Sequence, residues 1–345
     1  MSQLVLEENK VSQAIDRVVE RTFNMDFSWD WPGGVAFFGV AEAYEATGEE
    51  KYLQKIKDWV DSELEDGLPR LTVNASSIGH VLLTLYKATN DEKYLETAIK
   101  MADYLLHDAE RFGDGVLQHT VNGTKYQFPE QAWVDTMFMA GYFLLRIGHM
   151  LEREDYFNFG LKQYHGHENF LQDDRTNLYY HGWDNIAQNH MSSIFWARGN
   201  SWAAYTMARA LELIEVQHPS FMVIQGSLRD QLSALVRLQS DSGLWHTIVD
   251  DPDSYLETSG SAGIAAALLT SGKLYNKYTQ KALEAILSQI KEDGSVMGVS
   301  AGTAVMYDAN GYKEVPYKRV QGWGQGLVLA FLSLLLKREI GKSKQ

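Results

Sequence analysis

The chain has 345 residues, 45% of them hydrophobic, and no cysteine, which excludes disulfide bonds and thiolate metal sites. Acidic residues outnumber basic ones by 45 to 31, and the net charge of −14 argues against a nucleic-acid partner. The longest apolar runs, such as LVLAFLSLLL, are too short to span a bilayer, and the N-terminal stretch does not resemble a signal peptide. We therefore expect a soluble cytoplasmic protein with no membrane partner. A small acidic substrate remains compatible with this charge, because cations in a cleft can outweigh a distant net charge.

Six segments share one pattern, in which a nearly all-apolar stretch is followed by a polar turn and an amphipathic stretch. They begin at Gly39, Gly79, Gly141, Ser201, Gly263 and Gly324, with spacings of 40, 62, 60, 62 and 61 residues. A long period with helical patterning in both halves is typical of stacked helical hairpins. The apolar half suits a helix buried on all sides, and the amphipathic half suits a helix that faces solvent.

The sixth segment reaches the end of the chain before its second helix, and residues 8–23 can supply the missing partner. That pairing would close a ring of six buried helices inside six amphipathic ones. The sequence therefore predicts an all-α fold, an (α/α)6 barrel of six helical hairpins, in one domain over residues 1–345. Strand-like material is restricted to loops, and we expect residues 114–128 to pair as short hairpins.

Long loops follow the second helix of successive hairpins, after Gly67, Gly115, Asp173, Gly243 and Gly294. Long loops on a compact scaffold commonly carry function. In such a barrel the N-terminal ends of the inner helices all open at one end, so the residues before them should converge on one cavity.

The residues at these ends are rich in aromatic and charged side chains. They are Trp29, Asp30, Trp31, Asn74, Trp133, Asp135, His181, Trp183, Asp184, Trp196, Arg198, Trp202, Glu257, Ser259, Tyr317, Lys318, Arg319 and Trp323. Aromatic rings with one histidine, a few cations and a few carboxylates are typical of a carbohydrate site.

Asp135 stands near the start of an otherwise apolar run, Trp133–Met150, which has the length and composition of a buried helix. A carboxylate among apolar side chains is costly unless it is paired or used. Asp135 can stabilise the N-terminus of the helix through the helix macrodipole, or it can be a catalytic residue.

Four motifs resemble the unsaturated rhamnogalacturonyl hydrolases of glycoside hydrolase family 105, and the resemblance covers essentially the whole chain. In chain order the motifs are NGTKYQF, QAWVDTMFM, YYHGWD and WARGNSW. The related unsaturated glucuronyl hydrolases share the fold and the mechanism.

The resemblance implies that Asp135 is both general acid and general base. It implies that His181, Arg198 and Trp202 contact the unsaturated uronic acid, and that Trp196 and Lys125 occupy two further substrate positions. The glucuronyl hydrolases use a second Asp at the mouth of the second inner helix. Asn74 stands at that place here, and this difference favours the rhamnogalacturonyl assignment.

The implied reaction suits a single carboxyl group. Protonation of C4 of a 4,5-unsaturated uronic acid places positive charge on C5 and the ring oxygen, and water then adds to C5. One carboxyl group can give the proton and then take one from water, whereas ordinary glycosidases need two carboxylates. Arg198 could hold the substrate carboxylate through two N–H groups, which Lys cannot reproduce.

Other interpretations stay open. An inverting glycosidase would pair Asp135 with Asp184 or Asp30, although Asp184 could instead cap a turn. A sugar epimerase or a non-catalytic sugar-binding scaffold would also suit the barrel. No cofactor is predicted: we interpret His165 and His167 as surface residues rather than metal ligands, and no glycine-rich phosphate loop follows a strand.

Overall fold

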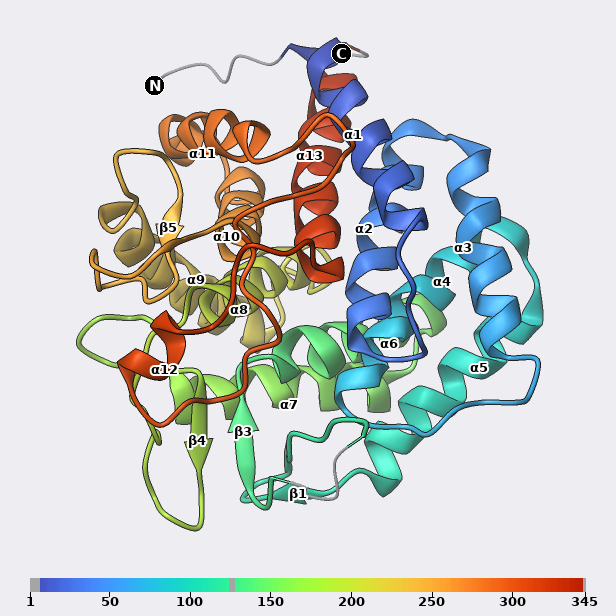
Figure 1. Cartoon of the computed structure of the whole chain (residues 1–345). Helices are drawn as coiled ribbons and strands as arrows, with labels where there is room; N and C mark the ends of the chain where they lie inside the picture. The colour runs from blue at the N-terminus through green and yellow to red at the C-terminus, as the bar shows by residue number, and fades with distance from the viewer. Residues whose placement is uncertain (1–6, 124–127, 344–345) are drawn as a thin grey trace.

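A computed structural model describes residues 7–123 and 128–343, with side chains up to Arg338. Within these residues the chain forms the predicted ring of helical hairpins (Figure 1). The inner helices are α2 (Trp31–Thr47), α4 (Gly79–Thr89), α6 (Phe143–Leu151), α8 (Ala197–Ala210), α10 (Thr258–Thr270) and α13 (Gly322–Ser343). The outer helices are α1 (Glu8–Phe23), α3 (Glu50–Glu63), α5 (Glu92–Asp103), α7 (Glu154–Leu171), α9 (Pro219–Arg237) and α11 (Asn276–Ser288).

Short helical turns extend several of these helices. They are the 3₁₀ turns η1 (Asn74–Ile78) and η4 (Lys273–Tyr275), the π-helical turns η2 (Tyr104–Asp108) and η3 (Met137–Tyr142), and the five-residue helix α12 (Ala309–Lys313). The turn η1 leads into α4, and η3 leads into α6, so both prolong inner helices. None of the helices in the described ranges has the length and hydropathy that a bilayer span requires.

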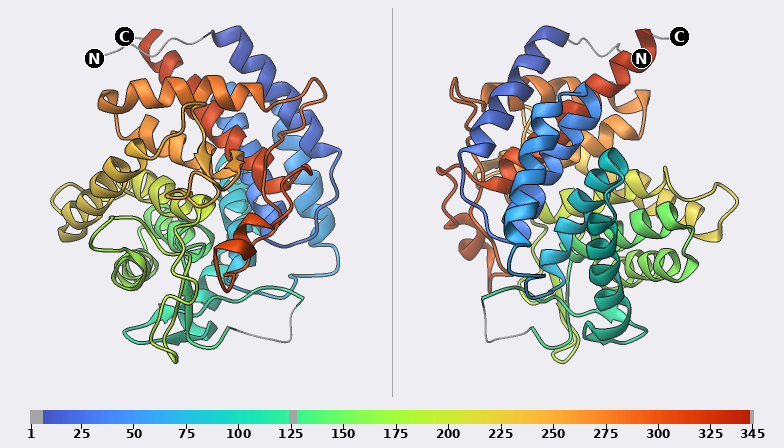
Figure 2. Two further views of the ribbon diagram at one scale, coloured as in Figure 1. Left: turned by 60° about the vertical axis from the view of Figure 1, so that its left-hand side comes forward. Right: turned by 90° about the vertical axis from the view of Figure 1, so that its right-hand side faces the viewer.

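The ring closes where the last inner helix meets the first. Helix α13 packs against α2 and against α1, which takes the place of the missing sixth outer helix (Figure 2). The contact with α2 is close because Gly39 faces Gly326: a Cβ on Gly39 would lie 2.3 Å from the carbonyl oxygen of Gly326. The predicted ring closure is therefore a tight glycine contact, which any larger side chain would push apart.

Three antiparallel two-stranded sheets lie in the long loops. They are β1 (Arg111–Phe112) with β2 (Val116–Leu117), β3 (Gln131–Trp133) with β4 (Gly182–Asp184), and β5 (Trp245–His246) with β6 (Leu256–Glu257). The hairpin expected within residues 114–128 is only partly right. Its strand β2 lies there, but the partner β1 precedes the segment.

The helix predicted from Trp133 is wrong in its start. Trp133 belongs to strand β3 and pairs with Gly182, because the chain there docks onto β4 rather than turning into a helix. The helix begins after Asp135, whose carbonyl oxygen accepts from the N–H groups of Phe138 and Met139 at 3.0 Å each. Asp135 therefore lies in the turn that joins β3 to the third inner helix.

Candidate active site

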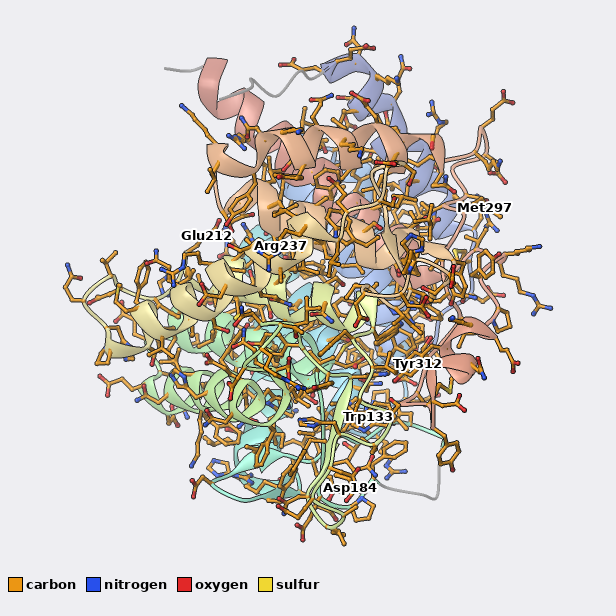
Figure 3. All side chains as sticks on the ribbon, turned by 90° about the vertical axis from the view of Figure 1, so that its left-hand side faces the viewer. Trp133, Asp184, Glu212, Arg237, Met297 and Tyr312 are labelled. Atoms are coloured by element: carbon orange, nitrogen blue, oxygen red, sulfur yellow. The ribbon has the colours of Figure 1, made fainter. Side chains whose placement is uncertain are left out.

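The β3–β4 sheet brings Asp135 and His181 together. Trp133 pairs with Gly182, and the N–H of Val134 donates to the carbonyl oxygen of His181 at 3.0 Å. The sheet runs outward from Trp133 to Asp184 (Figure 3). At its inner end, Nε2 of His181 lies 3.4 Å from Oδ2 of Asp135. The His181 side chain is fully buried and that of Asp135 is 14% exposed, so the carboxyl group is reached from only a small opening.

Aromatic rings surround the other faces of His181. Its ring lies 4.2 Å from that of Trp196 and 5.5 Å from that of Trp133, centroid to centroid. Its Nδ1 lies 2.7 Å from the hydroxyl oxygen of Tyr312. The imidazole is therefore packed between aromatic rings and hydrogen-bonded at Nδ1, while its Nε2 faces Asp135.

Arg198 continues this stack. Its guanidinium carbon lies 4.4 Å from the ring centroid of Trp196 and 5.4 Å from that of Trp323. Trp323 in turn stacks on Trp31 with ring centroids 4.3 Å apart. Residues from three separate predicted ends thus form one continuous row, which leads from the barrel mouth at Trp31 to His181.

The terminal nitrogens of Arg198 already donate to protein oxygens. Nη1 donates to the carbonyl oxygen of Ser300 at 3.2 Å and to its hydroxyl at 2.5 Å, and Nη2 donates to the carbonyl oxygen of Ala301 at 3.0 Å. Weaker bonds reach Ser259 and Thr303, both at 3.3 Å. A substrate carboxylate held by Arg198 would therefore replace contacts that now order residues 300–303.

Glu257 lies behind Arg198, with Oε1 3.6 Å from Nη1. The same oxygen accepts from the Ser259 hydroxyl at 2.6 Å and from the N–H of Ser300 at 3.0 Å, and Oε2 accepts from the N–H of Gly260. Glu257 therefore caps α10 and balances the buried guanidinium, and both of its oxygens are occupied.

Five of the site residues implied by the family resemblance carry a buried polar atom without a hydrogen-bond partner among the described residues. They are Asn74 (Oδ1), Asp135 (Oδ2), His181 (Nε2), Trp196 (Nε1) and Trp202 (Nε1). Unpartnered buried polar atoms are rare in native proteins, and each calls for an explanation. A polar ligand at this end of the barrel would supply partners for such a group.

Trp202 and Lys125 differ from the other predicted residues. The Trp202 ring is fully buried and packs on Phe138, with centroids 4.7 Å apart, so only its Nε1 remains for a ligand. No face of its ring is open for stacking on a sugar in this structure. Lys125 lies outside the described residues.

Two of the alternative carboxylates serve as caps. Oδ1 of Asp184 accepts from the N–H groups of Ile186 at 2.9 Å and Ala187 at 2.8 Å, so its turn-capping interpretation is confirmed. Its Oδ2 accepts from the side chain of Gln131. Asp30 caps α2 by accepting from the N–H of Trp31 at 2.8 Å.

The prediction that both close histidines are surface residues is wrong for His167. His167 is fully buried, and its Nδ1 lies 2.8 Å from the carbonyl oxygen of Gln163, because helix α7 turns this side chain inward. His165 is half-buried and lies 2.9 Å from the hydroxyl of Ser220. Across residues 7–123 and 128–343, no three acidic, histidine or cysteine side chains come together as metal ligands would.

Burial and neighbouring groups act in opposite directions on the pKa of Asp135. Burial raises it, but the contact with His181 and the charges of His119 and Arg198 outweigh burial, so the pKa lies below the ordinary value of 3.8. Burial lowers the pKa of His181 despite the nearby carboxylate, and it lowers that of His119 to about 4. The pair is therefore a carboxylate facing a neutral imidazole at neutral pH.

Three residues of this region were not predicted from the sequence as site residues. Tyr312 contacts His181, and His119 stacks on Trp133 with ring centroids 4.3 Å apart. His80 is fully buried and bonds the carbonyl oxygen of Phe138 at 3.1 Å, inside the π-helical turn that follows Asp135. His80 could have been found from the sequence, because it is a histidine within an apolar helix. No feature of the sequence around Tyr312 indicates a role in the site.

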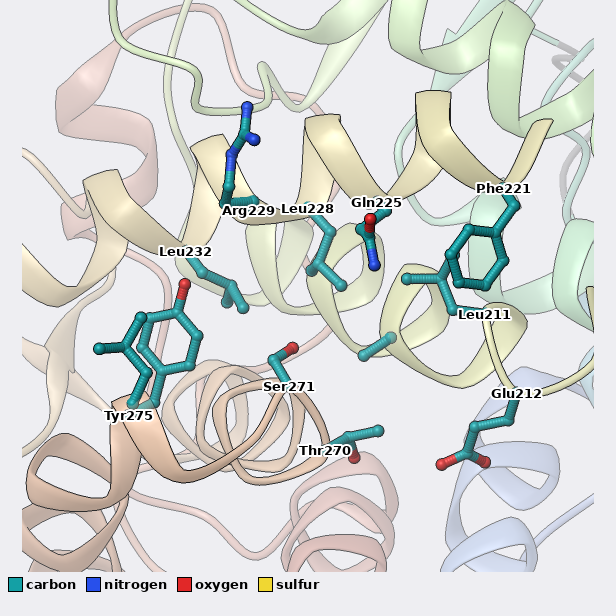
Figure 4. A pocket seen from close by; sticks show the side chains of 12 residues that line it. Leu211, Glu212, Phe221, Gln225, Leu228, Arg229, Leu232, Thr270, Ser271 and Tyr275 are labelled. Atoms are coloured by element: carbon teal, nitrogen blue, oxygen red, sulfur yellow. The ribbon is translucent and has the colours of Figure 1, made fainter. Parts of the chain in front are cut away.

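A separate groove lies between α8, α9 and α10, with a volume of about 450 Å³ (Figure 4). Its lining is half apolar, with Leu211, Phe221 and Leu232 among the apolar side chains. None of the predicted site residues lines it, and its only charged members are Glu212 and Arg229. The groove brings no histidine and no aromatic stack to its carboxylate, so the candidate site stays with Asp135.

A helical barrel whose mouth combines one carboxylate, a histidine and an arginine framed by tryptophans is typical of an enzyme that acts on carbohydrate. Comparison with known families agrees with this class. The model of Glycosyl Hydrolase Family 88 matches residues 5–338, and the chain belongs to this family.

The relatives extend the comparison. The chain is 68% identical over 337 residues to the unsaturated rhamnogalacturonyl hydrolase YesR of Bacillus subtilis (strain 168), with 98% of each chain covered. It is also similar to the crystal structure of a possible GH105 member from Salmonella enterica serovar Paratyphi A, with a TM-score of 0.92, 26% identity, and 98% and 97% of the two chains covered. An unsaturated glucuronyl hydrolase from Bacillus sp. GL1 shares the fold, with a TM-score of 0.71, 17% identity, and 96% and 97% of the two chains covered. The predicted resemblance and the predicted (α/α)6 barrel are both confirmed.

Proposed function

We propose that the enzyme removes 4,5-unsaturated galacturonic acid from the non-reducing end of rhamnogalacturonan lyase products. The observation that supports this most directly is that no backbone N–H in the described residues donates to the side chain of Asp135. The carboxylates of Asp30, Asp184 and Glu257, in contrast, accept from backbone N–H groups. A single carboxylate that is not used as a cap suits hydration of a vinyl ether better than the two-carboxylate chemistry of ordinary glycosidases. The 68% identity to a rhamnogalacturonyl hydrolase supports the sugar assignment.

In this reaction the Asp135 carboxyl group gives its proton to C4, and positive charge develops on C5 and the ring oxygen. Water attacks C5, and the Asp135 carboxylate takes one proton from that water. The resulting hemiketal opens as the C5–O5 bond breaks, and the hemiacetal left at C1 expels the neighbouring sugar. The products are 5-dehydro-4-deoxy-glucuronate and a rhamnose-ended sugar.

The remaining residues hold the substrate and orient the acid. Arg198 supplies the positive charge for the uronate carboxylate. On binding, this carboxylate replaces some of the hydrogen bonds that Arg198 now makes to residues 300–303. His181 holds one oxygen of Asp135. Trp196, Trp202 and Asn74 have unpartnered polar atoms for sugar hydroxyls, and Lys125 completes the proposed set. The substrate is thus a small acidic oligosaccharide, and we propose that the enzyme meets it in the cytoplasm.

The test compares two substrates with one enzyme preparation. Unsaturated galacturonyl-rhamnose and an unsaturated glucuronyl disaccharide are supplied in turn, and the loss of absorbance of the double bond is followed. We expect a higher kcat/KM for the galacturonyl compound, because discrimination arises in transition-state binding. Equal values, or a preference for the glucuronyl compound, would favour an unsaturated glucuronyl hydrolase. Binding without any turnover would favour a sugar-binding scaffold.

A further inference from the structure

We propose that Tyr312 is a positioning residue that fixes the His181 imidazole in the tautomer with its proton on Nε2. In that tautomer His181 donates to Oδ2 of Asp135 and leaves Oδ1 as the oxygen that carries the catalytic proton. The chemical consequence rests on the proposed function, whereas the tautomer itself can be measured without substrate.

The contacts of the Tyr312 hydroxyl restrict where its proton can go. Tyr312 is fully buried on α12, and its oxygen lies 2.7 Å from Nδ1 of His181. The backbone N–H of Met306 lies 3.4 Å away and the Ser192 hydroxyl 3.3 Å away. A backbone N–H can only donate, so the phenol oxygen accepts from Met306. Its single proton is left for either His181 or Ser192.

The other imidazole nitrogen decides between these two. Nε2 of His181 faces Oδ2 of Asp135 at 3.4 Å, and neither atom has a hydrogen-bond partner in the described part of the chain. The carboxyl group is ionised at neutral pH, because its pKa is lowered, and an ionised carboxylate only accepts. Two facing lone pairs would repel, so Nε2 carries the proton. A neutral imidazole has one N–H, so Nδ1 accepts from Tyr312.

The tautomer matters for the direction of proton transfer. When Asp135 is protonated, an Nε2–H still donates to Oδ2, so the acid proton resides on Oδ1 and can pass to C4. In the opposite tautomer the Nε2 lone pair would accept that proton and compete with the substrate. Tyr312 therefore prevents His181 from acting as a base toward Asp135.

The hydroxyl can be removed without disturbing the packing of the ring. Tyr312 shares a buried cluster with Trp196 and Ile248, and Phe keeps the ring in that cluster. A matched control is Tyr179, which is also fully buried and whose hydroxyl lies 2.8 Å from that of Ser227. Both Phe variants lose one buried hydroxyl, but only one of these hydroxyls faces His181.

The first measurement is the ¹⁵N spectrum of histidine-labelled wild-type protein, with the His181 signals assigned by their absence in His181→Gln. We expect a protonated Nε2 and an unprotonated Nδ1 for His181. A proton on Nδ1 in the wild type overturns the proposal, whatever any variant does. This measurement also stands if Tyr312→Phe fails to fold.

The second measurement compares Tyr312→Phe with Tyr179→Phe. In the Asp135→Asn background, which removes the carboxylate that holds the Nε2 proton, we expect Tyr312→Phe to show a mixture of His181 tautomers. In the otherwise wild-type enzyme we expect Tyr312→Phe to have a kcat about 10- to 100-fold lower, with KM within about threefold, since the effect lies in proton transfer rather than in binding. Tyr179→Phe should keep the wild-type tautomer and a kcat within about twofold of wild type, as expected for a hydroxyl that does not act on the site.

Two results with Tyr312→Phe would overturn the proposal. One is a His181 tautomer in the Asp135→Asn background that Tyr312→Phe leaves unchanged, because any loss of kcat in Tyr312→Phe alone would then have another cause. The other is a changed tautomer with an unchanged kcat, because the tautomer would then have no catalytic role. If the wild type does not turn over the unsaturated disaccharide, the proposed function fails, and the spectra recorded with and without the Tyr312 hydroxyl still decide whether Tyr312 fixes the tautomer.

Discussion

Nε2 of His181 lies 3.4 Å from Oδ2 of Asp135, and this pairing depends on a two-stranded sheet with three residues in each strand. The residue before Asp135 donates its N–H to the carbonyl oxygen of His181, so the two side chains leave the sheet at the same level. A shift of one residue in the sheet register would turn one of them away. The geometry of the acid is therefore set by backbone pairing between two loops.

Asp135→Asn is expected to abolish turnover and to leave the fold and much of the sugar binding intact. Asn keeps the shape of the side chain and loses the titratable proton. We expect kcat to fall by about 10²–10⁴-fold, the range typical of general acid–base catalysis. Initial rates on unsaturated galacturonyl-rhamnose, with binding measured by calorimetry, test this.

Asp184→Asn is the matched control, because the amide oxygen of Asn can still accept from the N–H groups of the turn. We expect near-wild-type rates. An Asp135→Asn rate above about a tenth of wild type would contradict the acid–base role, which is worth at least ~10²-fold. Loss of activity in both variants would instead indicate a two-carboxylate mechanism.

The pH dependence of kcat/KM should reflect the lowered pKa of Asp135 in the free enzyme. Burial raises this pKa, but His181, His119 and Arg198 lower it by more, so it lies below the ordinary value of 3.8. The protonated form of Asp135 therefore becomes scarce as the pH rises above that value. Because kcat/KM reports the free enzyme, it should fall as the pH rises from about 5 to 7.

In the substrate complex the uronate carboxylate and the loss of water both disfavour a second negative charge. The fall in kcat should therefore begin at a higher pH than the fall in kcat/KM. Full pH profiles of both parameters check this order. A kcat/KM that increases with pH over this range would show that Asp135 acts first as an anion, contrary to the proposed mechanism.

Arg198→Lys should be damaging although the charge is kept. The guanidinium reaches Ser300 and Ala301 through different nitrogens and lies between two indole rings, whereas an ammonium group is a single point of charge. Loss of one charge-assisted hydrogen bond is worth about 1.5–3 kcal/mol. We therefore expect kcat/KM to fall by about tenfold or more.

Arg175→Lys provides the comparison, because the Arg175 side chain is 86% exposed and lies 3.7 Å from Asp173. It should keep the wild-type kcat/KM. Normal kcat/KM for Arg198→Lys on the unsaturated disaccharide would show that the planar fork is not required.

The barrel could be predicted from the sequence because its signal is local and repeated. Each inner helix is apolar on all sides, each outer helix keeps a polar face, and six copies of the pattern reinforce one another. The direction of the inner helices then placed Asp135, His181 and Arg198 at one end without any knowledge of their contacts. The ring closure followed from the incomplete sixth hairpin.

The fine geometry of the site could not be predicted in the same way. Strands β3 and β4 are too short to leave a periodic signal, so Trp133 was assigned to a helix. The contact between Tyr312 and His181 joins residues 131 positions apart, and no local pattern specifies it. The hydrogen bonds of Arg198 likewise depend on how residues 300–303 fold over the barrel mouth.

Glu42 joins inner helices at the end of the barrel away from Asp135. Its carboxylate is nearly buried on α2 and lies 3.0 Å from Nζ of Lys337 on α13 and 3.7 Å from Arg209 on α8. Glu212, which shares Arg209 with it, lies well apart from Tyr312 and Trp133 (Figure 3). Burial raises the pKa of Glu42, but Lys337, Arg209 and Arg146 outweigh burial and hold it below the ordinary value of 4.5.

A carboxylate with a lowered pKa stabilises the fold fully above its ordinary value, and that contribution is lost as the pH falls toward its pKa in the folded state. Glu42→Gln should therefore lower the free energy of unfolding by about 1.5–3 kcal/mol at neutral pH, because it removes the buried charged acceptor of Lys337 and Arg209. Each cation keeps a second carboxylate that is less buried, Glu45 for Lys337 and Glu212 for Arg209. Urea denaturation at about pH 7, 5 and 3.5 should show this difference from wild type narrowing below about pH 4.5, where the Glu42 carboxylate of the unfolded chain begins to take up a proton while that of the folded protein stays ionised. Glu65→Gln, at an exposed position, should stay within about 0.5 kcal/mol of wild type throughout. A difference for Glu42→Gln that does not change with pH would mean that the loss comes from altered packing rather than from the charge of Glu42.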